Sequence, residues 1–339
     1  MPRRFIIFAA ATAGLVILVG AGFLSWIGTS RGLVPLRPAS PGARDIQHLY
    51  VFIGAFASFI FLVVTVPLAA FLVRFRSGGR SREEEGPQIR GHSSTELAWT
   101  LGPVLILIAI ATVTFILLPG INNAPAAQDG LDVTVVGRQF YWQYKYPNGV
   151  IAVDRMRAPV GRVVNLTIVA PVWDVNHSWW VPELGGKRDA IPGIVNHMWF
   201  KATRTGVFDG RCAELCGVFH ALMLTEVEVM PAGQFDAWLA RQAVAQRRGA
   251  SSIGHDVFAG VCAKCHGDQG QGGYARPIAN DALFNDPAAT RQLLVNGTRQ
   301  GTAVMPEVGR GWSSREMIAV LRYLHRNLAP KTGGTASGG

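Results

Sequence analysis

The sequence predicts a multi-domain membrane protein in which a transmembrane helical hairpin is followed by a small β-sandwich or barrel and then by an all-α domain. Three observations lead to this fold class. Hydrophobic residues make up 49% of the 339 residues and charged residues only 16%. Long uncharged apolar stretches open the chain, and short alternating runs later give way to helix-spaced apolar residues. At ~150 residues per domain, the length allows more than one domain.

The N-terminal third contains three uncharged apolar stretches, which are Phe5–Ile27, Val51–Val73 and Leu97–Pro119. Each reaches the ~20 residues that a helix needs to cross ~30 Å of hydrocarbon. Basic residues precede the first stretch, so it is either a cleaved secretory signal or an additional membrane helix. We therefore assign residues 1–44 to a signal peptide or extra helix with an outer loop, and residues 45–122 to a two-helix hairpin.

Charge predicts the orientation in the membrane. The loop between the second and third apolar stretches carries five arginines, Arg74, Arg76, Arg80, Arg82 and Arg90. The positive-inside rule places this loop in the cytoplasm, so everything after Pro119 lies on the periplasmic or outer side of a bacterial inner or plasma membrane. Much of the net charge of +10 sits beside apolar stretches, and no long basic run occurs. We therefore expect membrane lipid, and no nucleic acid, as a partner.

The middle of the chain, residues 123–240, alternates apolar and polar residues in short β-rich runs, as at 131–136, 163–169 and 223–229. This pattern predicts a small antiparallel sandwich or barrel of about 100 residues. After Pro231 the apolar residues follow helical spacing. A helix is therefore expected to close this domain.

The C-terminal part divides by composition. A polar stretch, residues 241–252, is expected to be a linker to a third unit over residues 253–330. Apolar residues at helical spacing in 253–258 and 312–328 predict two paired helices in that unit. The last residues, 331–339, are rich in Gly, Ser and Thr, which predicts a disordered tail.

Residues 212–223 carry the first cluster of metal-ligating side chains and read Cys-Ala-Glu-Leu-Cys-Gly-Val-Phe-His-Ala-Leu-Met. Thiolate, imidazole and thioether groups in one short loop form a soft ligand set that suits copper. Cys212 and Cys216 can bridge two copper ions, whereas a single-copper site needs only one cysteine. Each copper then needs an imidazole. His220 in the loop and His177 at the end of an aromatic strand are the best candidates.

Two weaker ligands and two alternatives complete this interpretation. The thioether of Met223 and the backbone carbonyl of Glu214 would be outer ligands. A disulfide between Cys212 and Cys216, which an oxidising compartment permits, would leave His220 and Met223 unexplained. A zinc site would rarely include Met. We therefore favour dinuclear copper.

The copper-type loop has the pattern of a known family. The Cys-x-Glu-x-Cys-x-x-x-His-x-x-Met loop, with a His-Ser-Trp strand 35 residues upstream, resembles subunit II of the haem–copper cytochrome c oxidases and its CuA centre. The resemblance covers roughly residues 45–240. It includes the Glu-Leu-Ala-Trp-Thr run at 96–100, the aromatic run 139–144 and the segment 182–193. It implies a cupredoxin-like fold for the β-domain.

The resemblance also implies roles for several acidic residues. The Glu214 side chain would reach a magnesium ion at the boundary with subunit I. Glu96 would stand near the cytoplasmic mouth of a proton path into subunit I, although an ionisable residue at a helix entrance can equally be a solvated cap. Asp174 and Asp189 would order polar networks near the copper and the magnesium.

A second redox motif follows in the C-terminal unit. Cys262-Ala-Lys-Cys265-His266 is a c-type haem attachment motif. The two thiols add to the haem vinyl groups, and the adjacent histidine is positioned to bind iron. The two helices predicted around this motif resemble the paired terminal helices of a small class I cytochrome c, with Phe258 and Tyr323 near their crossing. The all-α unit is therefore interpreted as a cytochrome c domain.

The sixth iron ligand should be a thioether from the chain between those helices. Met305 occupies the expected place, and Met/His ligation raises the haem potential. Met317 lies within the final helix and is interpreted as a core residue. His255 and His325 offer bis-histidine ligation as an alternative.

The favoured function is that of an electron-entry subunit of a proton-translocating cytochrome c oxidase. Electrons would pass from external cytochrome c or a quinol–cytochrome c reductase to haem c, then to CuA, and then to subunit I, which reduces oxygen. Subunit III is a further expected partner. The alternatives are the electron-entry subunit of a nitric oxide reductase and a copper metallochaperone. The run at 96–100 and the segment 182–193 favour the oxidase, and the haem motif disfavours the metallochaperone.

One departure from the family bears on electron entry. Conventional subunit II receives soluble cytochrome c beside an exposed tryptophan in the aromatic run, surrounded by acidic side chains. Here that position is Phe140, while Trp142 keeps the later aromatic place. Residues 120–230 carry 10 basic and 10 acidic residues, so no strongly acidic face is evident. We therefore hypothesise that the fused haem is the obligatory electron entry and delivers to copper near Phe140 and Trp142.

Overall fold

The computed structural model describes residues 37–76, 90–126, 130–249, 253–300 and 303–330, together with Gly22 and Gln88. The chain divides into two compact units, one containing the apolar helices and the other the remaining domains. The expectations for the first apolar stretch and for the tail 331–339 fall almost entirely outside the described residues.

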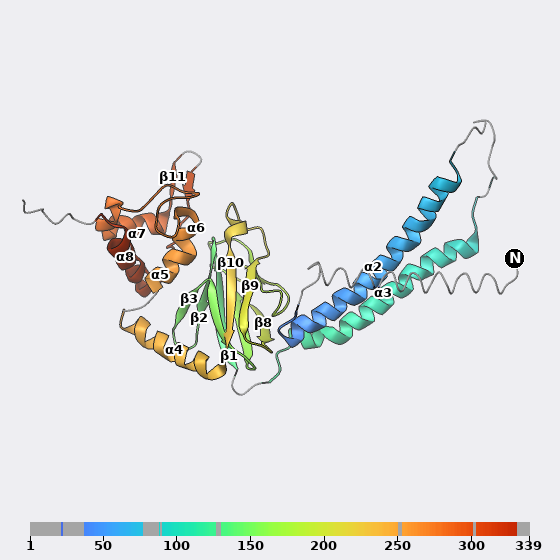
Figure 1. Ribbon diagram of the computed structural model, residues 1–339, viewed down its shortest axis with the longest axis horizontal. Coiled ribbons are helices and arrows are strands. Elements are labelled where there is room, and N and C mark those ends of the chain that lie inside the picture. Colours follow the sequence, from blue (N-terminus) through green and yellow to red (C-terminus); the bar gives the residue numbers. More distant parts are fainter. Residues whose placement is uncertain are drawn as a thin grey trace, which may run out of the picture. The chain divides into compact units, whose positions relative to one another are not determined.

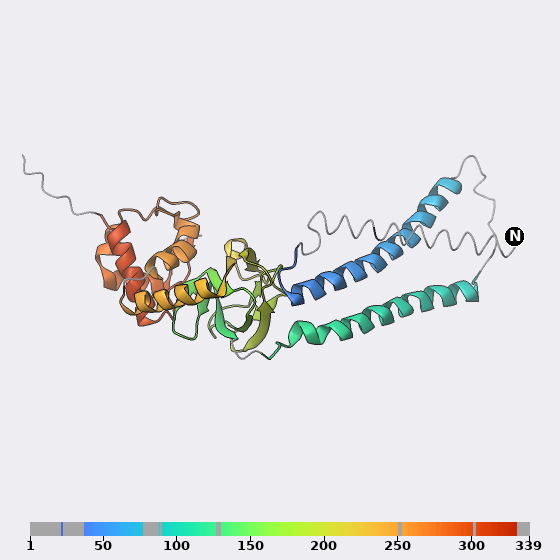
Figure 2. The ribbon, with the colours of Figure 1, turned by 60° about the horizontal axis from the view of Figure 1, so that its bottom comes forward.

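The first unit contains two long apolar helices, α2 (Pro41–Arg74) and α3 (Ser93–Asn122). Their mean hydropathies are 2.6 and 2.7, and both are long and apolar enough to cross a membrane. Figure 2 shows them as two extended rods. Their bounds include the predicted stretches Val51–Val73 and Leu97–Pro119. Large apolar side chains such as Phe115 are exposed along them, as expected for helices surrounded by lipid.

The second unit begins with a β-sandwich of two five-stranded sheets (Figure 1). In order across the first sheet, the strands are β3 (Ile151–Val153), β2 (Tyr141–Lys145), β1 (Leu131–Arg138), β5 (Val163–Val169) and β8 (Asn196–Lys201). In the second sheet they are β4 (Arg155–Pro159), β10 (Leu224–Met230), β9 (Gly206–Cys212), β6 (His177–Trp180) and β7 (Arg188–Ala190). The sandwich class was correctly predicted.

The predicted antiparallel arrangement is wrong for two strand pairs, because β1 pairs with β5 and β10 pairs with β4 in parallel. The other paired strands of the sandwich are antiparallel. Alternation along a strand fixes which side chains are buried, but it does not fix the direction of the neighbouring strand. The sandwich core is aromatic. The indole of Trp179 donates to the Tyr144 hydroxyl at 2.8 Å, and that hydroxyl lies 2.5 Å from the hydroxyl of Thr225. All three side chains are buried and hydrogen-bonded.

Helix α4 (Ala232–Arg247) closes the sandwich. Its Phe235 is buried, and the Gln246 side chain exchanges two hydrogen bonds with the backbone of Ile151 on β3. The helix therefore continues through residues 241–247 of the predicted linker. The polar composition of that stretch reflects a helix with one exposed face.

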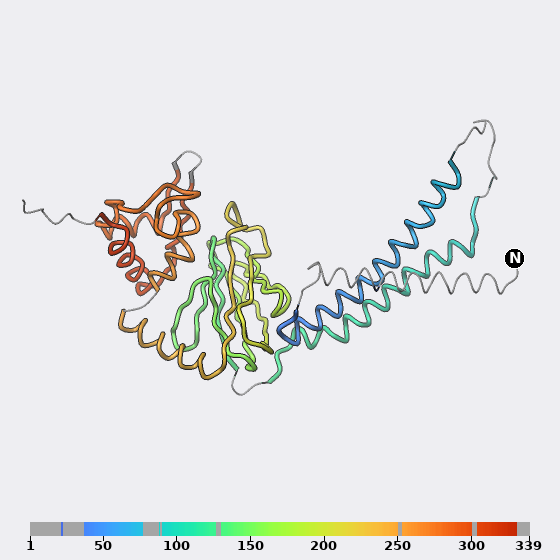
Figure 3. Tube along the Cα trace, in the orientation of Figure 1, coloured from blue at the N-terminus to red at the C-terminus, as the bar shows by residue number. Residues whose placement is uncertain are grey.

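The C-terminal domain is helical, and Figure 3 traces it as the orange and red end of the chain. Its elements are α5 (Ile253–Val257), the π-helical turn η2 (Phe258–Cys262), α6 (Ala263–His266), the 3₁₀ turn η3 (Ala282–Asn285), α7 (Pro287–Asn296), β11 (Thr298–Gln300), β12 (Ala303–Met305) and α8 (Ser314–Leu328). The rings of Phe258 and Tyr323 lie 5.2 Å apart, as expected for the crossing of the terminal helices. Helix α8 begins after Ser313, which forms a capping box with Glu316.

Candidate metal and haem sites

The copper-type ligands are brought together by the end of strand β9, strand β6 and the loop 212–223. This loop contains one 3₁₀ turn, η1 (His220–Leu222). Backbone hydrogen bonds from Cys212 to Met223 and from Ala213 to Ser178 hold the loop against the neighbouring strands. The sheet therefore fixes both ends of the ligand loop beside the strand that carries His177.

The predicted side chains converge. The two sulfurs of Cys212 and Cys216 are 3.9 Å apart. The Cys216 sulfur lies 3.6 Å from His220 Nδ1 and 3.8 Å from the Met223 sulfur. The Cys212 sulfur lies 3.2 Å from the backbone carbonyl of Glu214. Both cysteines are free thiols and buried, so the alternative disulfide is not formed.

His177 completes the cluster from β6. One of its ring nitrogens lies within 4.8 Å of both cysteine sulfurs. Nε2 lies 3.0 Å from Asp174 Oδ1, while the buried Nδ1 makes no hydrogen bond of ordinary geometry with the described residues and has the Cys212 sulfur as its neighbour. A buried polar nitrogen without a partner is costly in a folded protein. This orphaned atom and the adjacent sulfurs fit a soft metal ion.

The protonation of the two thiols is asymmetric. The hydrogen bond from Cys216, assisted by His177, lowers the pKa of Cys212 to about 3, although burial opposes this shift. The same hydrogen bond and burial raise the pKa of Cys216 far above its usual range. Burial acts to lower the pKa of His177, but Asp174 and Cys212 outweigh it and raise the value. The pair therefore favours one thiolate and one thiol. Ionising the second thiol requires added positive charge, which metal ions supply.

A polar network lies beside the copper-type loop. The Ser178 hydroxyl donates to Asp189 at 2.6 Å, and this hydrogen bond is the largest cause of the lowered pKa of Asp189. The ammonium group of Lys187 lies 3.1 Å from Asp189 and 3.8 Å from the Glu214 carboxylate. The Glu214 side chain is 45% exposed. Asp189 thus orders a network next to His177, while Glu214 has a lysine as a charged neighbour.

The haem attachment motif lies on η2 and α6. Cys262 and Cys265 are free thiols, and burial raises the pKa of Cys262 to about 12. His266 Nδ1 lies 2.8 Å from the carbonyl of Arg276, which accepts a hydrogen bond from it. In that tautomer Nε2 is left as the metal-binding nitrogen, the usual arrangement of a ligating histidine. The local geometry therefore fits a haem c iron at His266.

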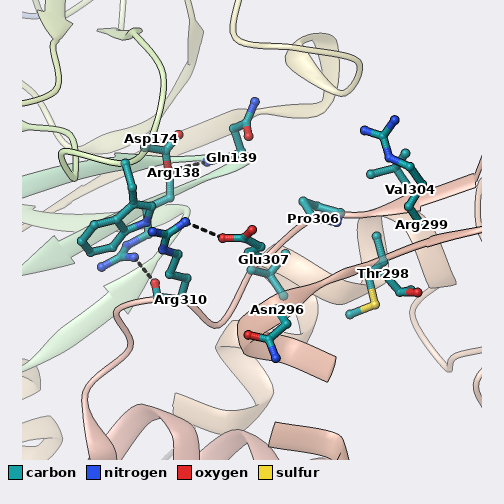
Figure 4. A pocket seen from close by; sticks show the side chains of 13 residues that line it. Arg138, Gln139, Asp174, Asn296, Thr298, Arg299, Val304, Pro306, Glu307 and Arg310 are labelled. Atoms are coloured by element: carbon teal, nitrogen blue, oxygen red, sulfur yellow. Dashed lines mark hydrogen bonds and ion pairs between the residues drawn. The ribbon is translucent and has the colours of Figure 1, made fainter. Parts of the chain in front are cut away.

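Met305 ends strand β12 and lines a cavity of about 400 Å³. Figure 4 shows that Arg138, Gln139 and Asp174 of the β-sandwich also line this cavity. The predicted sixth ligand therefore lines a cavity that the helical domain shares with the β-sandwich, which we also call the copper domain.

The other candidates for the sixth ligand are engaged elsewhere. Met317 is 4% exposed and belongs to the core of the helical domain, as predicted. His325 Nδ1 hydrogen-bonds to the carbonyl of Phe284, and His255 is exposed beside Asp256. The bis-histidine alternative therefore loses support.

The aromatic candidates for electron entry differ in burial. Phe140 is partly buried and packs edge-to-face on Phe219 of the copper-type loop, with ring centroids 5.3 Å apart. Trp142 is fully buried, and its ring lies 6.1 Å from that of His177. An external protein can therefore approach Phe140 more directly than Trp142.

Glu96 lies in the first turn of α3 in the other unit. Its carboxylate accepts a hydrogen bond from the backbone N–H of His92 at 3.0 Å. This contact belongs to the solvated cap that we named as the alternative to a proton-path role.

Contacts between the sandwich and the helical domain were not predicted. The Lys264 ammonium lies 2.6 Å from Asp154 Oδ2. The Trp312 indole donates to the Tyr141 hydroxyl at 2.7 Å. Gln143 donates to the buried carboxylate of Glu316. We call these three pairs, Lys264–Asp154, Trp312–Tyr141 and Gln143–Glu316, the docking contacts.

One signal for the docking surface was present in the sequence. A lysine stands between the haem-attaching cysteines, and two tyrosines and a glutamine occupy a strand that the alternation alone would partly expose. Their partners could not be read from the sequence, because long-range pairs leave no local spacing.

Three family models match the chain. Cytochrome C oxidase subunit II, transmembrane domain, matches residues 30–117, and Cytochrome C oxidase subunit II, periplasmic domain, matches residues 150–230. Cytochrome C oxidase, cbb3-type, subunit III matches residues 249–324. The three matches follow the order of the hairpin, the sandwich and the helical domain.

Individual proteins show the same similarity. The cytochrome c oxidase subunit 2 of Alkalihalophilus pseudofirmus is 33% identical over 265 residues, which cover 75% of this chain and 76% of that protein. The cytochrome c oxidase subunit 2 of Cereibacter sphaeroides is 33% identical over 238 residues, covering 59% of this chain and 77% of that protein. The crystal structure of the periplasmic domain of subunit II of cytochrome oxidase of Bradyrhizobium japonicum has 33% identity, covers 35% of this chain and 96% of that chain, and has a TM-score of 0.33.

Proposed function

The chain belongs to the cytochrome c oxidase subunit II family, and from that premise we propose that its own haem c domain is the donor to its copper centre. Family membership gives it an electron-entry role in a haem–copper oxidase and implies CuA copper. The match of residues 249–324 to a cytochrome domain model implies haem c. Family membership also implies association with subunit I in a bacterial membrane complex, with the sandwich on the periplasmic side. The steps and residues that follow belong to the proposal.

The proposed copper ligands would be two thiolates, two imidazoles and two weaker outer groups. In order along the chain they are His177, Cys212, the carbonyl of Glu214, Cys216, His220 and Met223. The distances between these groups and the orphaned Nδ1 of His177 support the assignment. When bound, the copper pair and the haem iron each supply one-electron redox chemistry. The protein holds the copper donors at the edge of a sheet, within a buried cluster.

The proposed haem ligands come from two elements of the helical domain. Cys262 and Cys265 would attach the porphyrin, and His266 and Met305 would be the iron ligands. The hydrogen bond that His266 donates to the Arg276 carbonyl supports the first assignment. Met305 packs against the apolar cluster that contains Cys262, which supports the second.

The observation that carries the proposed electron order is the docking of the haem attachment loop on the copper domain. Lys264, between the attaching cysteines, contacts the carbonyl of Phe140 at 3.0 Å. Phe140 in turn packs on Phe219 of the loop that holds the copper ligands. Electrons would therefore pass from an external cytochrome c or quinol–cytochrome c reductase to haem c. From there they would pass near Phe140 and Trp142 to CuA, and then to subunit I, where oxygen is reduced.

Two further assignments are carried from the family. We propose that the Glu214 carboxylate reaches a magnesium ion at the boundary with subunit I, where the nearby Lys187 would have to move aside. We propose that Glu96 stands at the entrance of a proton path, a role to be separated from its local cap on His92. Subunit III is a further proposed partner.

The test of the electron order is a complex truncated after Gly249. This cut keeps α4 and the clamp between Gln246 and Ile151, which a cut within the helix would remove. With CuA intact by EPR, the truncated complex should oxidise soluble cytochrome c far more slowly than the full chain. Replacing Phe140 with Trp should recover only part of that rate. Equal turnover of the truncated and full complexes would contradict the obligatory role of the haem.

The reaction itself is tested by the product. The complex supplied with reduced cytochrome c should consume oxygen and form water. Reduction of nitric oxide to nitrous oxide as the main reaction would instead support the nitric oxide reductase alternative.

A further inference from the structure

A lysine between the two haem-attaching cysteines contacts the copper domain. The Lys264 ammonium lies 2.6 Å from Asp154 Oδ2 and donates to the Phe140 carbonyl at 3.0 Å. The side chains of Lys264 and Asp154 are only 18% and 17% exposed. Charge-assisted hydrogen bonds in such partly dry surroundings are among the stronger ones in proteins. The attachment loop is therefore held at one fixed position against Phe140.

A second hydrogen bond continues from the neighbouring residue to the copper-type loop. The Gln139 side-chain amide donates to the carbonyl of Cys216 at 2.5 Å. Gly217 permits this approach. A Cβ at Gly217 would lie 3.0 Å from the Gln139 amide nitrogen and 3.1 Å from the Phe140 ring, and its φ of +130° disfavours other residues. The backbone of the copper-type loop is thus packed directly on the Gln139–Phe140 segment.

We propose that Lys264 and Gln139 are positioning residues that link the haem attachment loop to the copper-type loop for electron transfer. The link runs from Cys265 through Lys264 to the carbonyl of Phe140, and from the Gln139 side chain to the carbonyl of Cys216. Apart from these two hydrogen bonds, the link is covalent. It would serve a one-electron step in which ferrous haem becomes ferric and the copper pair gains one electron, with no atom or proton exchanged. The inference rests on the proposed electron order.

An aromatic route is the competitor. Phe140 lies 5.3 Å from Phe219, and Phe219 lies 6.2 Å from Tyr274 of the haem domain, measured between ring centroids. Tyr274 is 77% exposed, so its ring is weakly held by its surroundings. The hydrogen-bonded link consists of less exposed groups at contact distance. Electronic coupling decays less through bonds than across gaps, so we favour the hydrogen-bonded link.

The experiment replaces Lys264 with Met in the full complex loaded with haem and copper. Methionine keeps much of the side-chain length but removes the donor. After rapid partial reduction of the complex, the rate of electron transfer from haem to copper is followed through the absorption bands of the haem and of the copper centre. The reduction potentials of both centres are measured separately, and hydrogen exchange at residues 308–316 reports whether the domains remain docked. We expect a severalfold slower transfer with unchanged potentials and exchange, and recovery of most of the rate in Lys264→Arg.

Matched variants separate the explanations. Gln139→Leu should also slow transfer. Gln143→Leu removes a docking contact outside the link. It should raise hydrogen exchange at residues 308–316, while molecules whose domains remain docked should transfer electrons at nearly the wild-type rate. Tyr274→Leu should leave the rate unchanged.

Three results would overturn the link. These are an unchanged rate in Lys264→Met, a slowing accounted for by increased exchange or by shifted potentials, and a slowing in Tyr274→Leu instead. Failure of the proposed electron order would look different. In the wild-type complex, copper would then be reduced by the external donor before the haem, whatever residue stands at position 264.

Discussion

The copper and haem sites of this chain are built in different ways. The proposed copper ligands are in contact with one another. The Cys216 sulfur lies within 4 Å of another thiol, an imidazole and a thioether. The proposed haem ligands are each held by backbone groups of the helical domain. His266 is held through its ring by the carbonyl of Arg276, and Met305 by strand pairing with Thr298. The sandwich therefore preorganises its donors, while the helical domain presents ligands on separate elements. Variants at the two sites should consequently fail in different ways.

The largest effect is expected at the copper site. Cys216→Ser removes a sulfur that contacts three other proposed donors, so the copper pair should no longer form. The delocalised mixed-valence EPR spectrum should be lost, and turnover with it, while the haem absorption remains. The measurement is metal content and EPR of the purified complex. A content of one copper per β-sandwich domain in the wild type, or zinc in place of copper, would contradict a dinuclear copper site.

The haem site should respond more gradually. Met305→Ala leaves Cys262 and Cys265 untouched, so the haem should stay attached. The sulfur-to-iron absorption should disappear and the reduction potential should fall, because Met/His ligation raises the potential. Met317→Leu is the control, since a volume-conserving core exchange costs less than about 1.5 kcal/mol and should leave the spectrum unchanged. An unchanged spectrum in Met305→Ala would move the ligand elsewhere.

This difference in construction also decided what could be predicted from the sequence. Five of the six copper-type groups lie within one twelve-residue loop, so their spacing alone brings them together. The sixth, His177, is predicted from its place at the end of an aromatic strand, and the structure places it beside Cys212 and Cys216. The haem motif is equally local. The three long apolar stretches were predicted from length and hydropathy, and the structure describes helices over the second and third.

The docking contacts could not be predicted because their residues have no local relation. Trp312 and Tyr141 are 171 positions apart, and Gln143 and Glu316 are 173 apart. A buried tyrosine hydroxyl or carboxylate signals only that some partner exists. The same reasoning explains the wrong strand direction at β1 and β5, since pairing is decided by the whole topology. The sequence therefore predicts sites formed within one loop better than surfaces formed between domains.

The helical domain depends on close backbone contact, and this dependence gives a stability prediction. A Cβ at Gly254 would lie 2.8 Å from Cβ of Tyr323 and closer still to the carbonyl oxygen of Ala319. Gly254→Ala should therefore force α5 and α8 apart and destabilise the domain by about 1–3 kcal/mol. Thermal unfolding followed by haem absorption measures this change.

Gly233 on α4 supplies the matched control for that substitution. A Cβ there meets nothing within 4 Å, and alanine lowers the entropy of the unfolded chain. Gly233→Ala should therefore be neutral or stabilising by up to about 1 kcal/mol. An equal loss of stability in both variants would mean that the contact between α5 and α8 is not the cause.

The smallest expected effect concerns pH and tests the docking surface. Asp154 accepts a hydrogen bond from the backbone of Trp142 and pairs with Lys264. Burial nevertheless raises the pKa of Asp154 from 3.8 to about 6, because the opposing effects of Lys264 and the Trp142 N–H are smaller. Between pH 4 and 6 the folded chain therefore binds a proton that the unfolded chain has released. Stability must then fall as pH rises through that range, by up to about 3 kcal/mol for a shift of about two pKa units.

Asp154→Asn removes this titration and keeps an oxygen for the Trp142 N–H. Relative to that variant, the wild type should lose stability as pH rises from 4 to 6. The Tm of the wild type minus the Tm of Asp154→Asn should therefore decrease over this range. Asp281 provides a control of opposite sign, because the N–H of Leu283 and the guanidinium of Arg276 lower its pKa despite partial burial. Relative to Asp281→Asn, the wild type should gain or hold stability over the same range. If the wild type instead gained stability relative to Asp154→Asn with rising pH, the ion pair with Lys264 would outweigh the effect of burial. The docking contacts would then be stronger at high pH than at low pH.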